Sequence, residues 1–309
     1  MSQSVPVVCF SYLAAAELWQ VPRFPLANSG AEVLSVERSI AADAPMVAAV
    51  LAAFGVPTLL LTNDIGNEQK GREVHGWLQR YGVTTTAKVR TGTTTPQIAV
   101  VADNDATRTW FPHLPGVSNA LAALDLSPLL SAPFAYVDCY QLIETAAIRA
   151  VEAARSANVP LLLNLGGSPL SSAVITAVRS YPRLIIQSNV NDAACEPAPR
   201  VADEVLTATG AAWAVITAGA AGAVAASKTK QLTTPAFRAL VRHPHCAGAA
   251  FSAGLIYGLL NGWPMDDCLT LGCASGALRC ERAHHEPLPT LAELHAVIGS
   301  RERTSRSAA

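Results

Sequence analysis

The sequence predicts an α/β fold in which helices cover a mainly parallel sheet and a small β element stands off the main body. Short, continuous apolar runs alternate with longer segments of helical periodicity along most of the 309 residues. Runs such as Thr58–Leu61 and Pro160–Leu163 lack polar alternation, which is typical of strands buried on both faces. Residues 84–111 differ, because threonine-rich stretches and the Asp-Asn-Asp sequence at 103–105 indicate hairpins.

The predicted elements follow one another in the order expected for parallel strands joined by helices. A helix over 44–54 stops at Gly55-Val56-Pro57 and precedes the strand Thr58–Leu61. The strand Phe134–Val137 precedes a helix over about 143–157, whose apolar residues share one face. Residues 7–24 are expected to add a strand to the small β element, so that 1–309 forms one domain with β segments at 7–24 and 84–111. Further elements are expected at Pro160–Leu163 (strand), Ser171–Ser180 (helix), Leu184–Ile186 (strand) and Trp213–Ile216 (strand).

Composition narrows the function classes. Half of the residues are hydrophobic, yet no run reaches the about 18 apolar residues that a membrane span requires. The first ten residues lack a basic segment ahead of an apolar core, so no secretory signal is expected. The seven cysteines form no C-x-x-C pair, which favours reduced thiols in the cytoplasm. With a net charge of −1, the chain lacks the excess positive charge that is typical of nucleic-acid-binding proteins.

The most informative segment is His243–Phe251, which reads as a loop that enters a helix. Small residues at this entry would point several backbone N–H groups at one place, which is an anion site. In the helix that follows, Ala250, Gly254 and Gly258 form a stripe of small residues that would let a neighbouring helix approach closely.

The segment His243-Pro-His-Cys-Ala-Gly-Ala-Ala-Phe resembles the C-terminal signature D-T-x-G-A-G-D-x-F of the ribokinase and phosphofructokinase-B carbohydrate kinases. Residues 41–55 resemble the family's G-G-x-x-x-N-x-A stretch, and Thr217–Gly222 its T-x-G-x-x-G turn. Asp105–Thr109 resembles its lid hairpin, and Asn189-x-x-Asp192 stands where the family has N-x-x-E. The resemblance implies a ribokinase-like three-layer sandwich with a small β lid, and ATP and Mg²⁺ as cofactors.

Part of the family's nucleotide machinery is retained. By resemblance, Thr217, Gly219 and Gly222 line the nucleotide phosphates, where glycine lets the backbone approach closely. Asn189 and Asp192 match the pair that orders the water shell of magnesium, and the amides of Ala247 and Gly248 match the anion hole. Two simpler interpretations stay open, namely an ordinary turn after a strand at 217–222 and a capping Asx turn at 189–192.

The positions that hold and deprotonate a sugar in the family have lost their polar groups. Ala249 stands where the family has its general base, and a methyl group cannot accept a proton. Cys246 replaces the first glycine of the anion hole. All the other losses change a glycine or a polar side chain to alanine or methionine, which predicts an apolar pocket. They fall on the Gly-Gly pair (Ala41 and Ala42), the sugar-binding Asn (Met46) and the N-x-D motif (Ala14 and Ala16).

Other chemistry is possible beside these losses. A thiol at a helix N-terminus next to a histidine can have a lowered pKa, which would make Cys246 a nucleophile, and His245 could serve as a substitute base. The simpler interpretation is that Cys246 fills the place of a glycine and that His243 and His245 lie in a solvated loop.

Three functions therefore stay open from the sequence. The chain is a kinase-like phosphotransferase that acts on an alcohol less polar than a free sugar, another enzyme on this scaffold that uses Cys246 or His245, or a non-catalytic pseudokinase that binds a small molecule. The resemblance also implies a homodimer that covers the edge strands of the lid.

Overall fold

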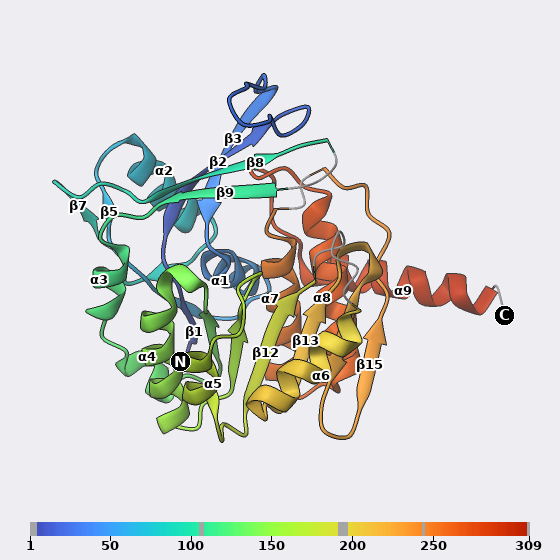
Figure 1. Ribbon diagram of the computed structural model, residues 1–309. Coiled ribbons are helices and arrows are strands. Elements are labelled where there is room, and N and C mark those ends of the chain that lie inside the picture. Colours follow the sequence, from blue (N-terminus) through green and yellow to red (C-terminus); the bar gives the residue numbers. More distant parts are fainter. Residues whose placement is uncertain (1–4, 105–107, 191–196, 243–244, 308–309) are drawn as a thin grey trace.

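A large twisted sheet forms the centre of the molecule (Figure 1). The computed structural model describes residues 5–104, 108–190, 197–242 and 245–307. Within them, the main sheet has nine strands in the order β15-β14-β13-β12-β11-β10-β1-β4-β6. Neighbouring strands from β6 to β13 run parallel, and β14 and β15 are antiparallel. The strands are β1 (Val7–Phe10), β4 (Thr58–Leu61), β6 (Thr84–Thr85), β10 (Ala135–Asp138), β11 (Leu161–Asn164), β12 (Leu184–Asn189), β13 (Trp213–Thr217), β14 (Ala223–Ala226) and β15 (Gln231–Thr234).

Helices on both faces of this sheet give three layers. Because successive side chains in a strand point to opposite faces, Val7 and Cys9 join one core cluster while Val8 and Phe10 join the other. The first cluster includes residues of α1 (Asp43–Ala53), α2 (Gln69–Arg80), α7 (Ala247–Leu260), α8 (Met265–Cys280) and α9 (Leu291–Ser307). The second includes residues of α3 (Val117–Ala122), α4 (Glu144–Ser156), α5 (Ser172–Val178) and α6 (Ala198–Thr209), with short 3₁₀ turns at η1 (Ser127–Ser131), η2 (Gln141–Ile143) and η4 (Gly219–Ala221).

The sequence prediction of the α/β body is confirmed, with small shifts at the element ends. The strand at Thr58–Leu61 has the predicted bounds, and the helix predicted over about 143–157 is α4, Glu144–Ser156. Strands such as β11 are buried along their whole length, which explains why they are continuous apolar runs.

A separate four-stranded sheet forms the lid, drawn at the top of Figure 1. Its order is β3 (Ser35–Ala41), β2 (Ala14–Gln20), β8 (Gln97–Ala102) and β9 (Arg108–His113).

The predicted lid segments are wrong in two places. Val7–Phe10 of the 7–24 segment lies in the centre of the main sheet, and residues 84–90 of the 84–111 segment pair elsewhere. There β6 joins the main sheet, and β7 (Val89–Arg90) pairs with β5 (Ile65–Gly66). The predicted turn residue Asp105 and the start of its strand at Thr107 lie outside the described residues.

Helices α7 and α8 pack closely, as the small-residue stripe predicts. A Cβ on Gly254 would lie 2.8 Å from the Leu271 carbonyl oxygen, and one on Gly258 would lie 2.7 Å from the Cys268 sulfur. The backbones therefore fill the space that side chains occupy in ordinary helix pairs. This contact holds α7 in place behind the loop that the sequence singled out.

Candidate active site

The carboxyl edge of the main sheet collects polar residues from four neighbouring strands. Asp138, Asn164, Asn189 and Thr217 are the last residues of β10, β11, β12 and β13. Asp138 lies opposite Asn164 in the sheet register, and Asn189 lies opposite Thr217. In open parallel sheets, ligands bind at this edge.

Helix α7 begins over the same edge. It starts at Ala247, and the Ser252 hydroxyl donates a 2.9 Å hydrogen bond to the Gln187 side chain of β12. The first N–H groups of a helix have no partner within the helix, so those near Ala247 and Gly248 are suited to an anion. Ala249 is almost fully buried in the core cluster on this side of the sheet.

Cys246 precedes α7 in a left-handed backbone conformation, with φ 67°. Glycine adopts this conformation without the steric cost that a Cβ brings, which explains why glycine is the ordinary residue at such a position. The sequence left a reactive thiol open at this position, and its surroundings argue against one. Burial raises the pKa of the Cys246 thiol to about 12, against a smaller opposing effect of the Arg279 guanidinium, so the thiolate needed for nucleophilic attack does not form near neutral pH.

His245 lies beside a buried polar group that the sequence did not predict. Its ring centroid is 5.4 Å from that of His284. The His284 Nδ1 atom lies 2.9 Å from the Arg279 guanidinium and 3.0 Å from the Ser39 hydroxyl of the lid. Because arginine can only donate, Nδ1 of His284 is an acceptor. His243 lies outside the described residues.

The turn at 217–222, which the resemblance assigns to the nucleotide phosphates, follows strand β13. Strand β13 ends at Thr217, Gly219 starts a 3₁₀ turn, and Gly222 has φ 98°. A Cβ on Gly222 would lie 2.1 Å from the Thr234 carbonyl oxygen, so packing against β15 alone requires glycine there. Asn189 is exposed at the neighbouring strand end, and Asp192 lies outside the described residues.

The residues predicted to line a sugar pocket lie where the lid meets α1. Ala14 pairs with Ala41 across β2 and β3, and Ala42 is the residue before α1. Ala14, Ala16 and Ala41 are buried in the core cluster beneath the lid, whereas Met46 is buried in the cluster on the other face of the sheet. Ala42 has φ 76°, a conformation that glycine adopts more easily than alanine.

The sequence analysis missed an acid pair at this point. The Asp138 Oδ2 atom accepts hydrogen bonds from the backbone N–H groups of Asp43 (3.1 Å) and Ala44 (2.9 Å) at the start of α1. Its Oδ1 atom accepts from the Tyr136 hydroxyl at 2.9 Å and from the Asn164 amide at 3.1 Å. Four donors thus surround Asp138, which favours its ionised form.

Asp43 is held by two donors on one oxygen. The Tyr140 hydroxyl (2.8 Å) and the Asn164 amide (2.9 Å) both donate to Oδ2. The orientation of the Asn164 amide is fixed because its oxygen accepts from the Gly166 N–H at 3.0 Å. Among the described residues, no hydrogen bond occupies Oδ1 of Asp43, and Asp43 is partly accessible.

The two carboxyl groups share one electrostatic environment. Burial raises the pKa of Asp43, against its hydrogen bonds with Tyr140 and Asn164 and the charge of Arg108. Burial and the neighbouring Asp43 raise the pKa of Asp138 to about 7. Such a pair titrates as one unit. Because donors occupy both oxygens of Asp138, we place the proton that the pair retains on Oδ1 of Asp43.

The raised pKa predicts how stability depends on pH. The relevant pH range runs from the pKa of an unfolded aspartate, about 4, to the raised pKa of the pair. In this range the native state binds more protons than the unfolded state, so the free energy of unfolding falls as pH rises. Asp43→Asn removes one charge and keeps the shape. At pH 8 we expect the variant to exceed the wild type in free energy of unfolding, because it lacks the charge that burial disfavours.

Urea unfolding at pH 5 and pH 8 checks this expectation, and the difference between variant and wild type should shrink at pH 5. Asp203→Asn on exposed α6 is the control and should change little at either pH. A variant less stable than the wild type at pH 8 would show that the Asp43 charge is favourable, contrary to the geometry.

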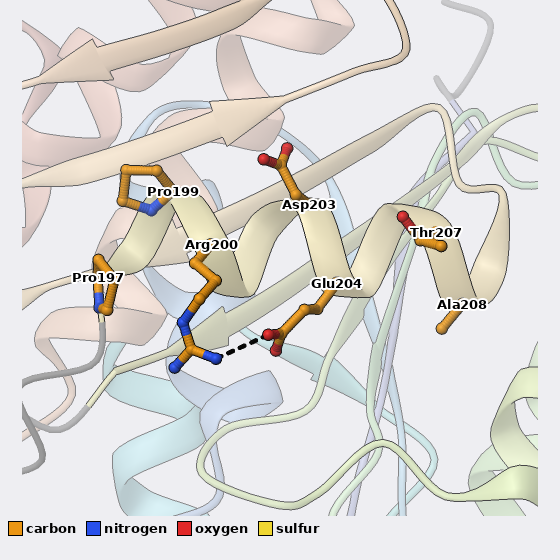
Figure 2. A pocket seen from close by; sticks show the side chains of 7 residues that line it. All are labelled: Pro197, Pro199, Arg200, Asp203, Glu204, Thr207 and Ala208. Carbon is orange, nitrogen blue, oxygen red and sulfur yellow. Dashed lines mark hydrogen bonds and ion pairs between the residues drawn. The ribbon is translucent and has the colours of Figure 1, made fainter.

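Two surface cavities lie away from the acid pair. Figure 2 shows the first, whose lining residues all belong to α6 or to Pro197 before it, with Arg200 and Glu204 paired at 2.8 Å. It is therefore the outer face of one helix. The second, of about 320 Å³, lies between the lid and α2 and is lined by residues that include Ala16, Glu17 and Lys70.

The family model for pfkB family carbohydrate kinases matches residues 8–290, which include the lid, the acid pair, the turn at 217–222 and α7. The chain belongs to the pfkB family. No curated protein matches the sequence of this pfkB family member.

Solved structures agree on the fold of this pfkB family member. Arabidopsis thaliana ribokinase complexed with ribose and ATP has a TM-score of 0.76 at 17% identity, over 96% of this chain and 99% of that one. Burkholderia thailandensis nucleoside kinase in complex with inosine has a TM-score of 0.76 at 20% identity, over 95% and 97%. Escherichia coli phosphofructokinase-2 in complex with potassium has a TM-score of 0.73 at 13% identity, over 96% and 99%. The ribokinase-like fold is thus confirmed.

Two further observations concern the described part of the chain. It contains no group of three or more His, Cys, Asp or Glu side chains placed to hold a metal ion. None of its helices combines the length and the apolar character needed to cross a membrane.

Proposed function

We propose that this pfkB family protein transfers the γ-phosphoryl group of ATP to a hydroxyl group of a small alcohol. One observation carries the proposal. The partly accessible Asp43 carboxyl group is held at the carboxyl edge of the sheet by Asn164, the last residue of β11, and α1, which starts at Asp43, packs against α7, whose start is suited to an anion. An anion site and a hydroxyl acceptor thus lie together at the carboxyl edge of the sheet. Phosphoryl transfer depends mainly on such positioning and on electrostatics.

ATP would lie along the turn formed by Thr217, Gly219 and Gly222. The end of β12 supports this placement, because Asn189 lies opposite Thr217 in the sheet register. Asn189 and Asp192 would hold Mg²⁺ through water. When bound, the ion would neutralise charge on the phosphates, which is its usual contribution to this chemistry.

The acceptor we propose is an alcohol less polar than a free sugar. Alanine methyl groups at 14, 16 and 41 provide the apolar side of the region beneath the lid, and Ile98 and Val100 of β8 join the same cluster. A molecule with many hydroxyl groups would leave some of them without partners there, which costs free energy. Two of the structural neighbours are complexes with ribose or with inosine, so these molecules are sensible first acceptors.

The test measures phosphorylated product directly. Purified protein is incubated with ATP and Mg²⁺ and with D-ribose, D-fructose or inosine in turn, and the products are identified by mass spectrometry. We expect phosphorylated product from at least one acceptor and none without Mg²⁺. If every acceptor stays unmodified while ATP–Mg²⁺ raises the melting temperature, the protein binds the nucleotide without transferring its phosphate.

That outcome describes the second candidate function, a non-catalytic protein that binds a small molecule. One observation favours it. Ala14, Ala16, Ala41, Met46 and Ala249 are all buried, so side chains fill much of the space where the family holds its sugar. A ligand of such a protein would raise its melting temperature without being changed.

We further propose that two copies associate through the lid in the cytoplasm. The described cysteines are all free, which suits a reducing compartment. Trp110 and Phe111 of the edge strand β9 are each more than half exposed, and covering them would bury apolar surface. Size exclusion with light scattering should give twice the chain mass, and the double variant Trp110→Glu/Phe111→Glu should give the mass of one chain. A wild-type protein with the mass of one chain would contradict this proposal.

A further inference from the structure

Transfer of a phosphoryl group to an alcohol releases the hydroxyl proton, and the residue at 249 is an alanine that cannot take it. If the proposed phosphotransfer holds, on which this inference rests, another group must remove that proton. The described carboxyl group that combines accessibility, a fixed orientation and an unoccupied oxygen at this site is that of Asp43.

The orientation of Asp43 is set from three elements. Tyr140 follows β10, Asn164 ends β11, and the backbone N–H of Asp43 itself is held by Asp138. Because both side-chain donors bind Oδ2, the carboxyl plane is fixed and Oδ1 is the oxygen that a bound hydroxyl group can reach. A catalytic group works best when packing and hydrogen bonds hold it in this way.

The charges around Asp43 suit a proton acceptor. Burial raises the pKa of Asp43, which makes its carboxylate a stronger proton acceptor than that of an exposed aspartate. The charge of Arg108, in the lid strand β9, lowers the pKa of Asp43 and so favours its ionised form. The titratable and charged groups that interact electrostatically with Asp43 or Asp138 are Tyr136, Tyr140, Tyr12, Arg108, Cys9, Cys139 and Cys246.

Asp43 also lies near the start of α7. It affects the pKa of Cys246, the residue that precedes α7, and Arg108 affects the pKa of both residues. Helix α1 also packs against α7. A molecule whose hydroxyl group contacts Asp43 can therefore lie toward the amides at the start of α7.

We propose that Asp43 is the general base of this protein and takes the place of the missing carboxylate at 249. The acceptor oxygen forms a bond to the γ-phosphorus while the bond between that phosphorus and the β–γ bridging oxygen breaks. The hydroxyl proton passes to Oδ1 of Asp43, and ADP leaves with the electron pair of the broken bond. Asp138 and Tyr140 act as positioning residues, since they hold Asp43 without contacting the reacting atoms.

The test compares the wild type with Asp43→Asn, using ATP–Mg²⁺ and whichever of D-ribose, D-fructose and inosine the wild type phosphorylates fastest. We expect kcat to fall by about 10²- to 10⁴-fold while KM for the acceptor changes less than about threefold. The kcat of the wild type should rise with pH between pH 5 and pH 8 and then level off, whereas that of the variant should stay low and flat. Asp203→Asn should behave as the wild type.

Melting temperatures separate loss of catalysis from loss of structure, because ATP–Mg²⁺ should raise the melting temperature of Asp43→Asn as much as that of the wild type. An unchanged kcat in Asp43→Asn overturns the assignment while the phosphotransfer stands, and so does a change confined to KM. If the wild type phosphorylates none of the three acceptors, the proposed function fails and the general base fails with it.

Discussion

Asp138→Ala is expected to lower the free energy of unfolding by about 3 kcal/mol or more, because Asp138 is a fully buried acceptor for several donors. The variant leaves the Ala44 N–H and the Tyr136 hydroxyl without their acceptor, and it removes one acceptor each from the Asp43 N–H and the Asn164 amide. Relief of the repulsion with Asp43 offsets only part of this loss, since each donor left buried and unpaired costs about 1–3 kcal/mol.

Urea unfolding at pH 7 measures this change. Asp203→Ala removes a carboxyl group from an exposed position of α6 and should stay within about 0.5 kcal/mol of the wild type. A loss of less than about 1 kcal/mol in Asp138→Ala would show that water replaces the carboxylate as an acceptor.

Gly254→Leu is expected to cost about 3 kcal/mol or more, or to prevent folding. Its Cβ alone would lie 2.8 Å from the Leu271 carbonyl oxygen and 2.9 Å from the Gly272 Cα, and both of these atoms belong to the α8 backbone. A side-chain neighbour could rotate away, but a helix backbone can only move as a whole. The two helices would separate, and the start of α7 would leave its place over β12.

Urea unfolding again measures the cost, with Gly76→Ala as the matched control. Gly76 lies on the exposed face of α2, and a Cβ added there would meet no heavy atom within 4 Å, so alanine should stabilise the protein by about 0.5–1 kcal/mol. If Gly254→Leu unfolds at the same urea concentration as the wild type, the close packing of α7 and α8 does not exist in solution.

The sequence predicted the α/β body well because each strand carries its own signal. Thr58–Leu61 and Leu161–Asn164 are short apolar runs between helices with one apolar face, and both faces of these strands are buried. The lid was less predictable. Strand β3, with the sequence SVERSIA, is mostly exposed and polar, and no turn signal in the sequence separates Val7–Phe10 from β2, which follows it closely.

The acid pair escaped prediction for a topological reason. Asp43 and Asn164 are 121 residues apart, and only the parallel order of β10 and β11 brings Asp138 and Asn164 together beside α1. A polar residue at the end of an apolar strand, as in AYVD and LLLN, was the available signal. For Cys246, the sequence shows the neighbouring histidine but does not show burial, which raises the pKa of the thiol.

The methyl group of Ala42 has a consequence for how a ligand would bind. Glycine at a positive φ can visit many other conformations, whereas alanine with φ 76° stays there only because the surrounding structure holds it. The entrance to α1 is therefore preorganised, and little chain entropy remains for a ligand to remove. We therefore expect a ligand to be selected by its fit to the existing backbone shape, without rearrangement of the loop.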